Sequence, residues 1–284
     1  MLNRFDDAVA DCGMSLTRDP KLVKVHNRQG RALLKLGRPR EARTSFEAAR
    51  THAHMMANAA ASSVAAGAAA AAAPPLAYLR DATAEAETGL ADTAAFCEYV
   101  EAAIDHQAKD DFREVLCNTE GALAHAPAAS ELQQMRTIAL RKLKRWPEVL
   151  AFCERCSAFN AKQVSLPAGR GGDSLRAALA GPHGLKVAAA LRLEPLLAEN
   201  YALALRYCEK CEESESVLRA LLGAQPQSAL AQWAAKQLRS IEDLRRHKEG
   251  ADASYRRGKY HAAVAIYTEA LHVDPLADVV NTVL

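Results

Sequence analysis

Apolar and small residues recur at helical spacing in several stretches of the chain, and each stretch ends near a proline. The clearest stretch is GKYHAAVAIYTEALHVDP, residues 258–275, in which the recurring residues are Tyr260, Ala263, Tyr267 and Ala270. Residues three or four apart share one face of an α-helix, and a proline prevents the helix from continuing. Three further stretches repeat this order: Phe5, Ala8, Cys12, Ser15 and Pro20; Phe112, Val115, Thr119, Ala122 and Pro127; and, more weakly, Cys211, Ser214, Leu218, Leu221 and Pro226.

Each of these helices is expected to follow another helix across a short turn, and residues 25–50 form the clearest pair. Gly30 is expected to let the two helices approach closely, and Gly37 to form the turn. The predicted inward face of the second helix consists of Ala42, Phe46 and Ala49. Helix–turn–helix units at a period of about 34 residues resemble the tetratricopeptide repeat. Such units stack on their neighbours, so we predict an all-α protein with a right-handed superhelix, an α-solenoid.

The rhythm of the repeats breaks twice and so divides the chain into five predicted segments. One break holds the alanine run from Ala57 to Ala73 and the helix-stopping prolines that follow it, and the other is rich in glycine. The predicted segments are 1–52, tetratricopeptide repeats of which the first is partial; 53–93, an Ala/Pro-rich insert; 94–160, tetratricopeptide repeats; 161–194, a Gly-rich loop or degenerate repeat; and 195–284, tetratricopeptide repeats of which the last is truncated.

Composition supports helices and argues against several classes of function. Only 5% of the 284 residues are aromatic, and alanine, the strongest helix former, dominates the apolar set. The net charge of +2, from 36 basic and 34 acidic residues, is not the footprint of a nucleic-acid-binding protein. The alanine run is shorter than a membrane span of roughly 20 residues, and the charged N-terminus is unlike a signal peptide. We therefore expect a cytoplasmic protein that binds neither nucleic acid nor membrane, with reduced cysteines.

Three segments carry a closer resemblance, namely residues 4–49, 98–127 and 244–275. In their succession they are similar to the DnaJ-like tetratricopeptide co-chaperones, which also carry a J domain. The resemblance implies a protein that binds client proteins and the C-terminal tails, ending in Glu-Glu-Val-Asp, of heat-shock protein 70 and heat-shock protein 90 chaperones. Basic and amide side chains of successive repeats would grip the two carboxylates of the final aspartate through charge-assisted hydrogen bonds.

The resemblance assigns four positions of this sequence to such tail-binding clamps. Lys24 and Arg28, four residues apart on one helix face, match the Lys/Arg pair of the third clamp repeat. Lys248 matches the first lysine of a second clamp, but Asp252 stands where those co-chaperones have an asparagine, and its charge would repel a carboxylate. The match also implies that the chain starts midway through one clamp repeat and ends before the second clamp is complete.

No catalytic signature accompanies these repeats. The His-Pro-Asp tripeptide on which J domains depend does not occur in the sequence, nor does a phosphate-binding loop or a Gly-x-Ser-x-Gly motif. The prediction is therefore a protein without catalytic residues or cofactors. A tetratricopeptide scaffold for an unrelated partner complex remains an alternative.

A second alternative is a zinc or redox protein, because two Cys-x-x-Cys pairs occur in the sequence. They are Cys153 with Cys156 and Cys208 with Cys211, and two such pairs can form a four-cysteine zinc site. The first pair lies at packing positions of a predicted helix, where a free cysteine behaves as a small apolar residue. We therefore predict no metal site at these four cysteines.

Overall fold

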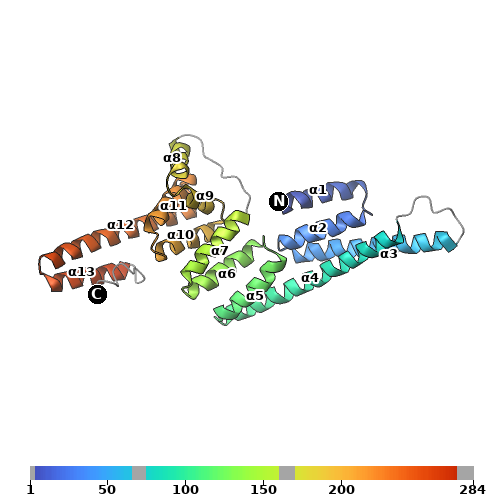
Figure 1. The fold of residues 1–284 in the computed structure, drawn as a ribbon, viewed down its shortest axis with the longest axis horizontal. Coiled ribbons are helices and arrows are strands. Elements are labelled where there is room, and N and C mark those ends of the chain that lie inside the picture. Colours follow the sequence, from blue (N-terminus) through green and yellow to red (C-terminus); the bar gives the residue numbers. More distant parts are fainter. Residues whose placement is uncertain (1–3, 66–74, 160–169, 274–284) are drawn as a thin grey trace. The chain divides into compact units, whose positions relative to one another are not determined.

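The computed structural model describes residues 4–65, 75–159 and 170–273, and every regular element in these ranges is a helix (Figure 1). The all-α prediction is therefore confirmed. The chain divides into two compact units, Met1–Leu143 and Lys144–Leu284, which are described separately below. The helices are α1 Phe5–Arg18, α2 Val23–Lys35, α3 Pro39–Ala65, α4 Leu76–Ala108, α5 Phe112–His125 and α6 Ser130–Lys142 in the first unit, and α7 Trp146–Phe159, α8 Arg170–Ala180, α9 Gly184–Leu191, α10 Pro195–Tyr207, α11 Cys211–Ala224, α12 Ala229–Arg256 and α13 Tyr260–Val273 in the second.

In the first unit each helix packs on the next one in the chain, and α2 also packs on α4. This is the arrangement of a helical repeat array, in which the first helices of successive pairs lie side by side. The turn between α2 and α3 contains Gly37 at a φ of 75°. A Cβ atom at Gly37 would approach the Cβ of Ala129 to 2.6 Å, so this turn requires glycine on two grounds.

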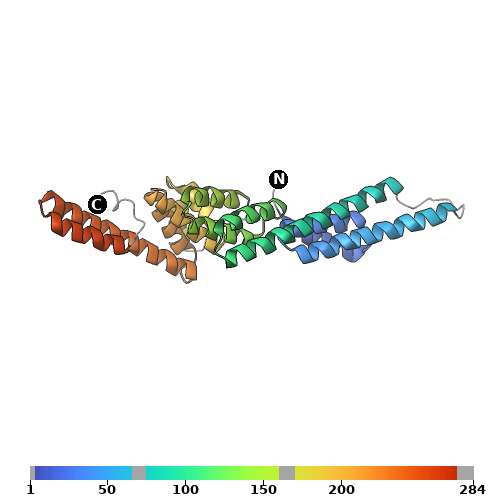
Figure 2. The same ribbon diagram turned by 90° about the horizontal axis from the view of Figure 1, so that it is seen from below.

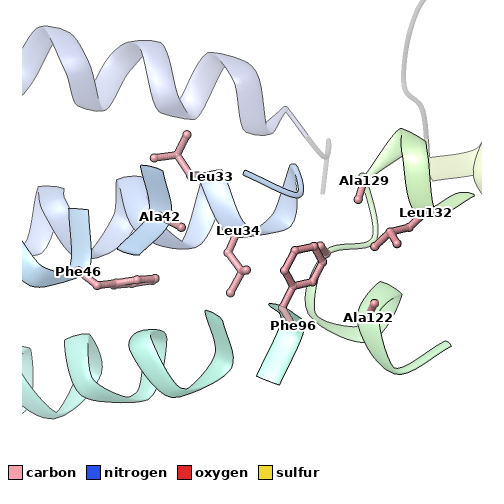
Figure 3. Close-up of a cluster of buried hydrophobic side chains, with 9 residues drawn as sticks. Leu33, Leu34, Ala42, Phe46, Phe96, Ala122, Ala129 and Leu132 are labelled. Carbon is pink, nitrogen blue, oxygen red and sulfur yellow. The ribbon is translucent and has the colours of Figure 1, made fainter. Parts of the chain in front are cut away.

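Phe46 of α3 is fully buried in the core of the first unit, in one cluster with Leu34 and Phe96 (Figure 3). Its ring lies against Gly30 of α2 and Gly89 of α4, where added Cβ atoms would come within 2.8 Å and 2.4 Å of ring carbons. Ala42 and Ala49 are fully buried as well. The predicted inward face of this helix is confirmed, and so is the close approach at Gly30.

Long α3 and α4 run side by side through much of the segment that the sequence predicts as an insert (Figures 1 and 2). Ala53, Ala82 and Ala86 are buried between them, with Met56 packed against the cluster. Small side chains let two helices approach closely over a long contact. The predicted segment 53–93 therefore contributes two packed helical stretches, while residues 66–74 lie outside the described part.

The second unit buries Tyr201 of α10 completely, together with Leu197 and Leu205 of the same helix. Helices α8 and α9 pack on each other and on α11. They come from the segment predicted as a Gly-rich loop or degenerate repeat, of which residues 161–169 lie outside the described part. Alanine and leucine dominate residues 175–191, so helix formers prevail on both sides of the Gly181-Pro182 break.

Helices α12 and α13 form the hairpin that the opening pattern predicts. Ala263, Tyr267 and Ala270 of α13 are buried and cluster with Ala251 of α12. The predicted helical face is therefore confirmed at Ala263, Tyr267 and Ala270, but Tyr260, which the pattern placed on the same face, is 59% exposed. Pro275 and the expected start of a further repeat in residues 276–284 lie outside the described residues.

Candidate functional site

Helix α2 carries a row of four basic side chains, Lys24, Arg28, Arg31 and Lys35, which we call the basic row. Their spacing of four, three and four residues places them on one face of the helix. The helix contains no aspartate or glutamate. Lys24, Arg28 and Arg31 are exposed, and Lys35 is half-buried. A helix face with this charge attracts anionic groups.

The basic row lies beside α4, and three contacts fix the register of the two helices. The Nζ of Lys24 lies 4.6 Å from the centre of the Tyr78 ring, a cation–π contact. The buried Asn27 amide donates to the carbonyl of Ala82 at 2.8 Å, and further along the helices Arg31 forms an ion pair with Glu85. Residue numbers rise together on both helices, so α2 and α4 run parallel, and the surface that they form together along the basic row is called the α2/α4 groove below.

A pocket of about 350 Å³ lies at the Arg31–Lys35 end of this surface. Leu34, Phe46 and Gly89 supply its apolar floor, and the charged side chains of both walls surround it. On the α4 wall, Asp92 Oδ1 lies 3.6 Å from His125 Nδ1. The α2 wall contributes Lys35, for which no ion-pair partner occurs among the described residues. The residues lining the pocket are Arg31, Leu34, Lys35, Phe46, Glu85, Thr88, Gly89, Asp92 and His125.

The other two sequence-predicted residues, Lys248 and Asp252, lie one turn apart on α12 in the second unit, and both are half-buried. Asp252 accepts a hydrogen bond from the Tyr267 hydroxyl of α13. This carboxylate, at the position where the co-chaperones have asparagine, therefore joins the two helices of its own hairpin. The hydrogen bond to Asp252, with burial as the second cause, raises the pKa of Tyr267 to about 12.

Replacing Tyr267 with phenylalanine is expected to destabilise the α12/α13 hairpin by about 1.5–3 kcal/mol, the usual contribution of a hydrogen bond to a charged group. In the folded chain Tyr267 titrates near 12, above the value of about 10 expected when it is unfolded. Its contribution to stability is therefore complete below pH 10 and is lost as the pH rises from 10 to 12. Denaturant unfolding of the second unit at pH values from 9 to 12 measures both effects. A Tyr267→Phe chain whose free energy of unfolding depends on pH as it does in the wild type would contradict the assignment of this pH dependence to Tyr267.

The four cysteines of the Cys-x-x-Cys pairs differ in environment. Cys153 and Cys156 are buried, Cys208 is half-buried and Cys211 is exposed. Burial raises the pKa of the Cys153 thiol, whose sulfur lies 3.7 Å from the Leu197 carbonyl oxygen. A raised pKa disfavours the thiolate, which is the form that binds zinc and attacks disulfides. Over the described ranges, no group of three or more His, Cys, Asp or Glu side chains is placed to hold a metal ion.

The structure adds residues to the candidate site that the sequence predicts in the first unit. Lys24 and Arg28 lie on a common exposed face, as their spacing requires, but Arg31, Lys35 and Tyr78 were missed. The two basic residues could have been found from the continued spacing along α2. Tyr78 could not, because it follows the prolines of the predicted insert and only the packing of α4 brings it to Lys24. No described helix is long and apolar enough to cross a membrane.

Comparison with known proteins places these features in context. No model of a known protein family matches the chain. The chain shows weak homology to DnaJ homolog subfamily C member 7 of Homo sapiens, with 26% identity over 275 residues, and to the Mus musculus protein of that name, with 24% identity. Both alignments cover 97% of this chain, which spans 43% of the length of these relatives.

A solved structure shows the same kind of fold. It is the TPR domain of P58(IPK), which superposes with a TM-score of 0.57 at 14% sequence identity. The superposition covers 96% of this chain and 60% of that one. The architecture is therefore that of tetratricopeptide repeats, and the similarity to DnaJ homolog subfamily C member 7 that the sequence suggested is confirmed.

Proposed function

We propose that this tetratricopeptide chain is a co-chaperone-like scaffold that binds the acidic C-terminal tails of heat-shock protein 70 and heat-shock protein 90 chaperones in the groove between α2 and α4. The fold and the weak homology to DnaJ homolog subfamily C member 7 support a protein-interaction scaffold. The observation that carries the finer proposal is the basic row of α2, where Lys24 and Arg28 are exposed on one face.

Electrostatics gives the groove its preference for such a tail. A peptide that ends in aspartate presents two carboxylates within one residue, and Lys24 and Arg28 present two cations one helical turn apart. Charge-assisted hydrogen bonds between them fix the register of the tail. The Tyr78 ring beside Lys24 restricts the ammonium group and so lowers the entropy lost on binding. No bond chemistry is involved, and we propose a non-catalytic role in the cytoplasm, with client proteins as further partners.

Calorimetric titration with a peptide ending in Glu-Glu-Val-Asp tests this proposal. The same peptide with a C-terminal amide is the matched control, because it keeps every side chain and loses one charge. The free acid is expected to bind at least about tenfold more tightly, since a hydrogen bond to a charged group contributes about 1.5–3 kcal/mol. The difference should shrink as salt is raised. Equal affinity for acid and amide, or no binding of either, would remove the tail-binding proposal.

The second unit favours a second candidate function, a scaffold for a partner without an acidic tail. Asp252 places a carboxylate beside Lys248 and is already engaged by Tyr267. This arrangement disfavours a second clamp for carboxylates. A stable complex recovered from cells without either heat-shock chaperone, and unaffected by excess tail peptide, would support this alternative.

A further inference from the structure

One acidic side chain lies within the basic row. Arg31, the third cation of the row, forms an ion pair with Glu85 of α4. The Glu85 side chain is 28% exposed and that of Arg31 is 59% exposed, so the carboxylate is the more shielded of the two. Arg28 of the proposed clamp lies three residues before Arg31, which corresponds to about 4.5 Å along the helix axis. A negative charge therefore lies close to the position at which an acidic tail is proposed to bind.

Helix α2 holds the Glu85 carboxylate at a second point. The side chain of Asn27 is fully buried, and its amide donates to Glu85 Oε2 at 3.3 Å as well as to the Ala82 carbonyl. Asn27 and Arg31 lie one turn apart on α2, so Glu85 is fixed by two contacts on the same helix. These contacts restrict the rotamers of Glu85, and its charge stays in the α2/α4 groove.

Glu87 is a glutamate of α4 outside this arrangement. It lies two residues after Glu85, which is about 200° around the helix and therefore on a different side. It is exposed, and it forms no ion pair in the described part of the chain. The two glutamates have the same charge and differ in their position relative to the basic row, so Glu87 is a matched control for Glu85.

The ion pair has two consequences for an anion that approaches this part of the groove. The Glu85 carboxylate neutralises Arg31, which therefore contributes little to the attraction of a ligand. The same carboxylate repels the acidic groups of a ligand, because the energy between two like charges rises as their distance falls. Water and salt weaken both effects, since the Arg31 side chain is more than half exposed. The expected change in affinity is therefore moderate.

We propose that Glu85 is an internal competitor of acidic ligands, which occupies Arg31 and so limits the affinity of the α2/α4 groove for an acidic tail. This inference rests on the proposed function, because the clamp at Lys24 and Arg28 defines the ligand. Changes in affinity within one interface appear mostly in the dissociation rate, so Glu85 speeds the exchange of bound tails. The competing acid comes from residues 53–93, which the sequence predicts as an insert. This segment therefore tunes binding at the preceding helix pair.

Calorimetric titration of a Glu85→Gln variant with the free-acid peptide ending in Glu-Glu-Val-Asp tests the competitor. Glutamine keeps the size of the side chain and an oxygen that can accept from Asn27, so the variant changes mainly the charge. We expect it to bind the tail about two- to fivefold more tightly, the range of an exposed charge pair. Glu87→Gln, with the same change in net charge, should alter the affinity less than about 1.5-fold at physiological salt. No gain, a loss, or equal gains in the two variants would overturn the competitor.

A double variant tests whether Glu85 acts by occupying Arg31. Arg31→Gln together with Glu85→Gln removes both members of the ion pair and leaves the net charge unchanged, so it should bind the tail within about twofold of the wild type. Arg31→Gln alone should weaken the tail, because it leaves the Glu85 charge unpaired. A double variant that binds as tightly as Glu85→Gln would show that the released Arg31 contributes nothing, and the competition for Arg31 would be wrong.

The acid and amide forms of the tail separate this inference from the proposed function, and thermal unfolding checks that each variant remains folded. If the wild-type protein does not distinguish acid from amide tails, the proposed function itself fails. If it does distinguish them but Glu85→Gln binds the tail no better than Glu87→Gln, only the competitor fails.

Discussion

Replacing Phe46 with alanine is expected to lower the free energy of unfolding of the first unit by about 3–5 kcal/mol, the usual cost of removing a fully buried phenylalanine ring. The ring is completely buried in α3 and lies against Gly30 of α2 and Gly89 of α4. The two glycines have no side chains that could extend into the space left by the ring, so a cavity would remain at their contact with residue 46. Denaturant unfolding followed by hydrogen exchange of residues 23–108 measures this loss.

Two internal controls make the Phe46→Ala result specific. Phe112 is only half-buried, so Phe112→Ala should cost clearly less. Both tryptophans, Trp146 and Trp233, lie in the second unit. Their fluorescence transition should therefore stay in place while exchange in the first unit accelerates. A Phe46→Ala chain whose α2–α4 amides remain protected as in the wild type would contradict the assigned role of the ring.

Replacing Lys24 and Arg28 together with alanine is expected to weaken binding of the acidic tail by about 30- to 100-fold. Each lost charged hydrogen bond is worth about 1.5–3 kcal/mol, reduced here by the exposure of both side chains. Neither side chain is part of the core, so the stability of the first unit should change little. Calorimetric titration with the free-acid peptide measures the loss, and thermal unfolding checks the fold.

A variant with the same change in net charge distinguishes specific contacts at Lys24 and Arg28 from long-range attraction between the charges of the protein and of the peptide. Arg40 and Arg43 are exposed on α3, outside the basic row. Arg40→Ala with Arg43→Ala removes two charges and should weaken the tail no more than about twofold at physiological salt. If the two double variants lose affinity equally, long-range charge and not a clamp holds the peptide.

The spacing of small and apolar residues along the sequence was sufficient to predict the helix pairs. Gly30, Gly37 and Phe46 were assigned from sequence because each satisfies a short-range rule: close approach, a turn with positive φ, or one face of a helix. The hairpin of α12 and α13 was predicted in the same way. Such rules depend on spacing along one helix or across one turn, and spacing is directly readable in a sequence.

The features that the sequence did not reveal depend on neighbours distant in the chain. Gly89 contacts Phe46 across two helices, and Tyr78 meets Lys24 only because α4 runs parallel to α2. The alanine-rich composition between them carries no periodic contrast of large and small residues, so its packed helical stretches were interpreted as an insert. The sequence shows Asp252 only as a departure from the expected asparagine, because its partner Tyr267 is identifiable only once α13 has folded back on α12.

The contact of one ring with two glycines has a further consequence for binding kinetics. The Phe46 ring is packed tightly against Gly30 of α2 and Gly89 of α4, and this contact restrains the separation of the two helices at that point. A preorganised groove spends little free energy on its own rearrangement and favours association in a single step. A smaller residue at position 46 would loosen the contact between α2 and α4, and we expect it to shorten the residence time of a peptide bound as proposed, although it changes no side chain of the basic row. For the proposed peptide binding, we therefore expect the dissociation rate to depend on the packing of this ring in the core.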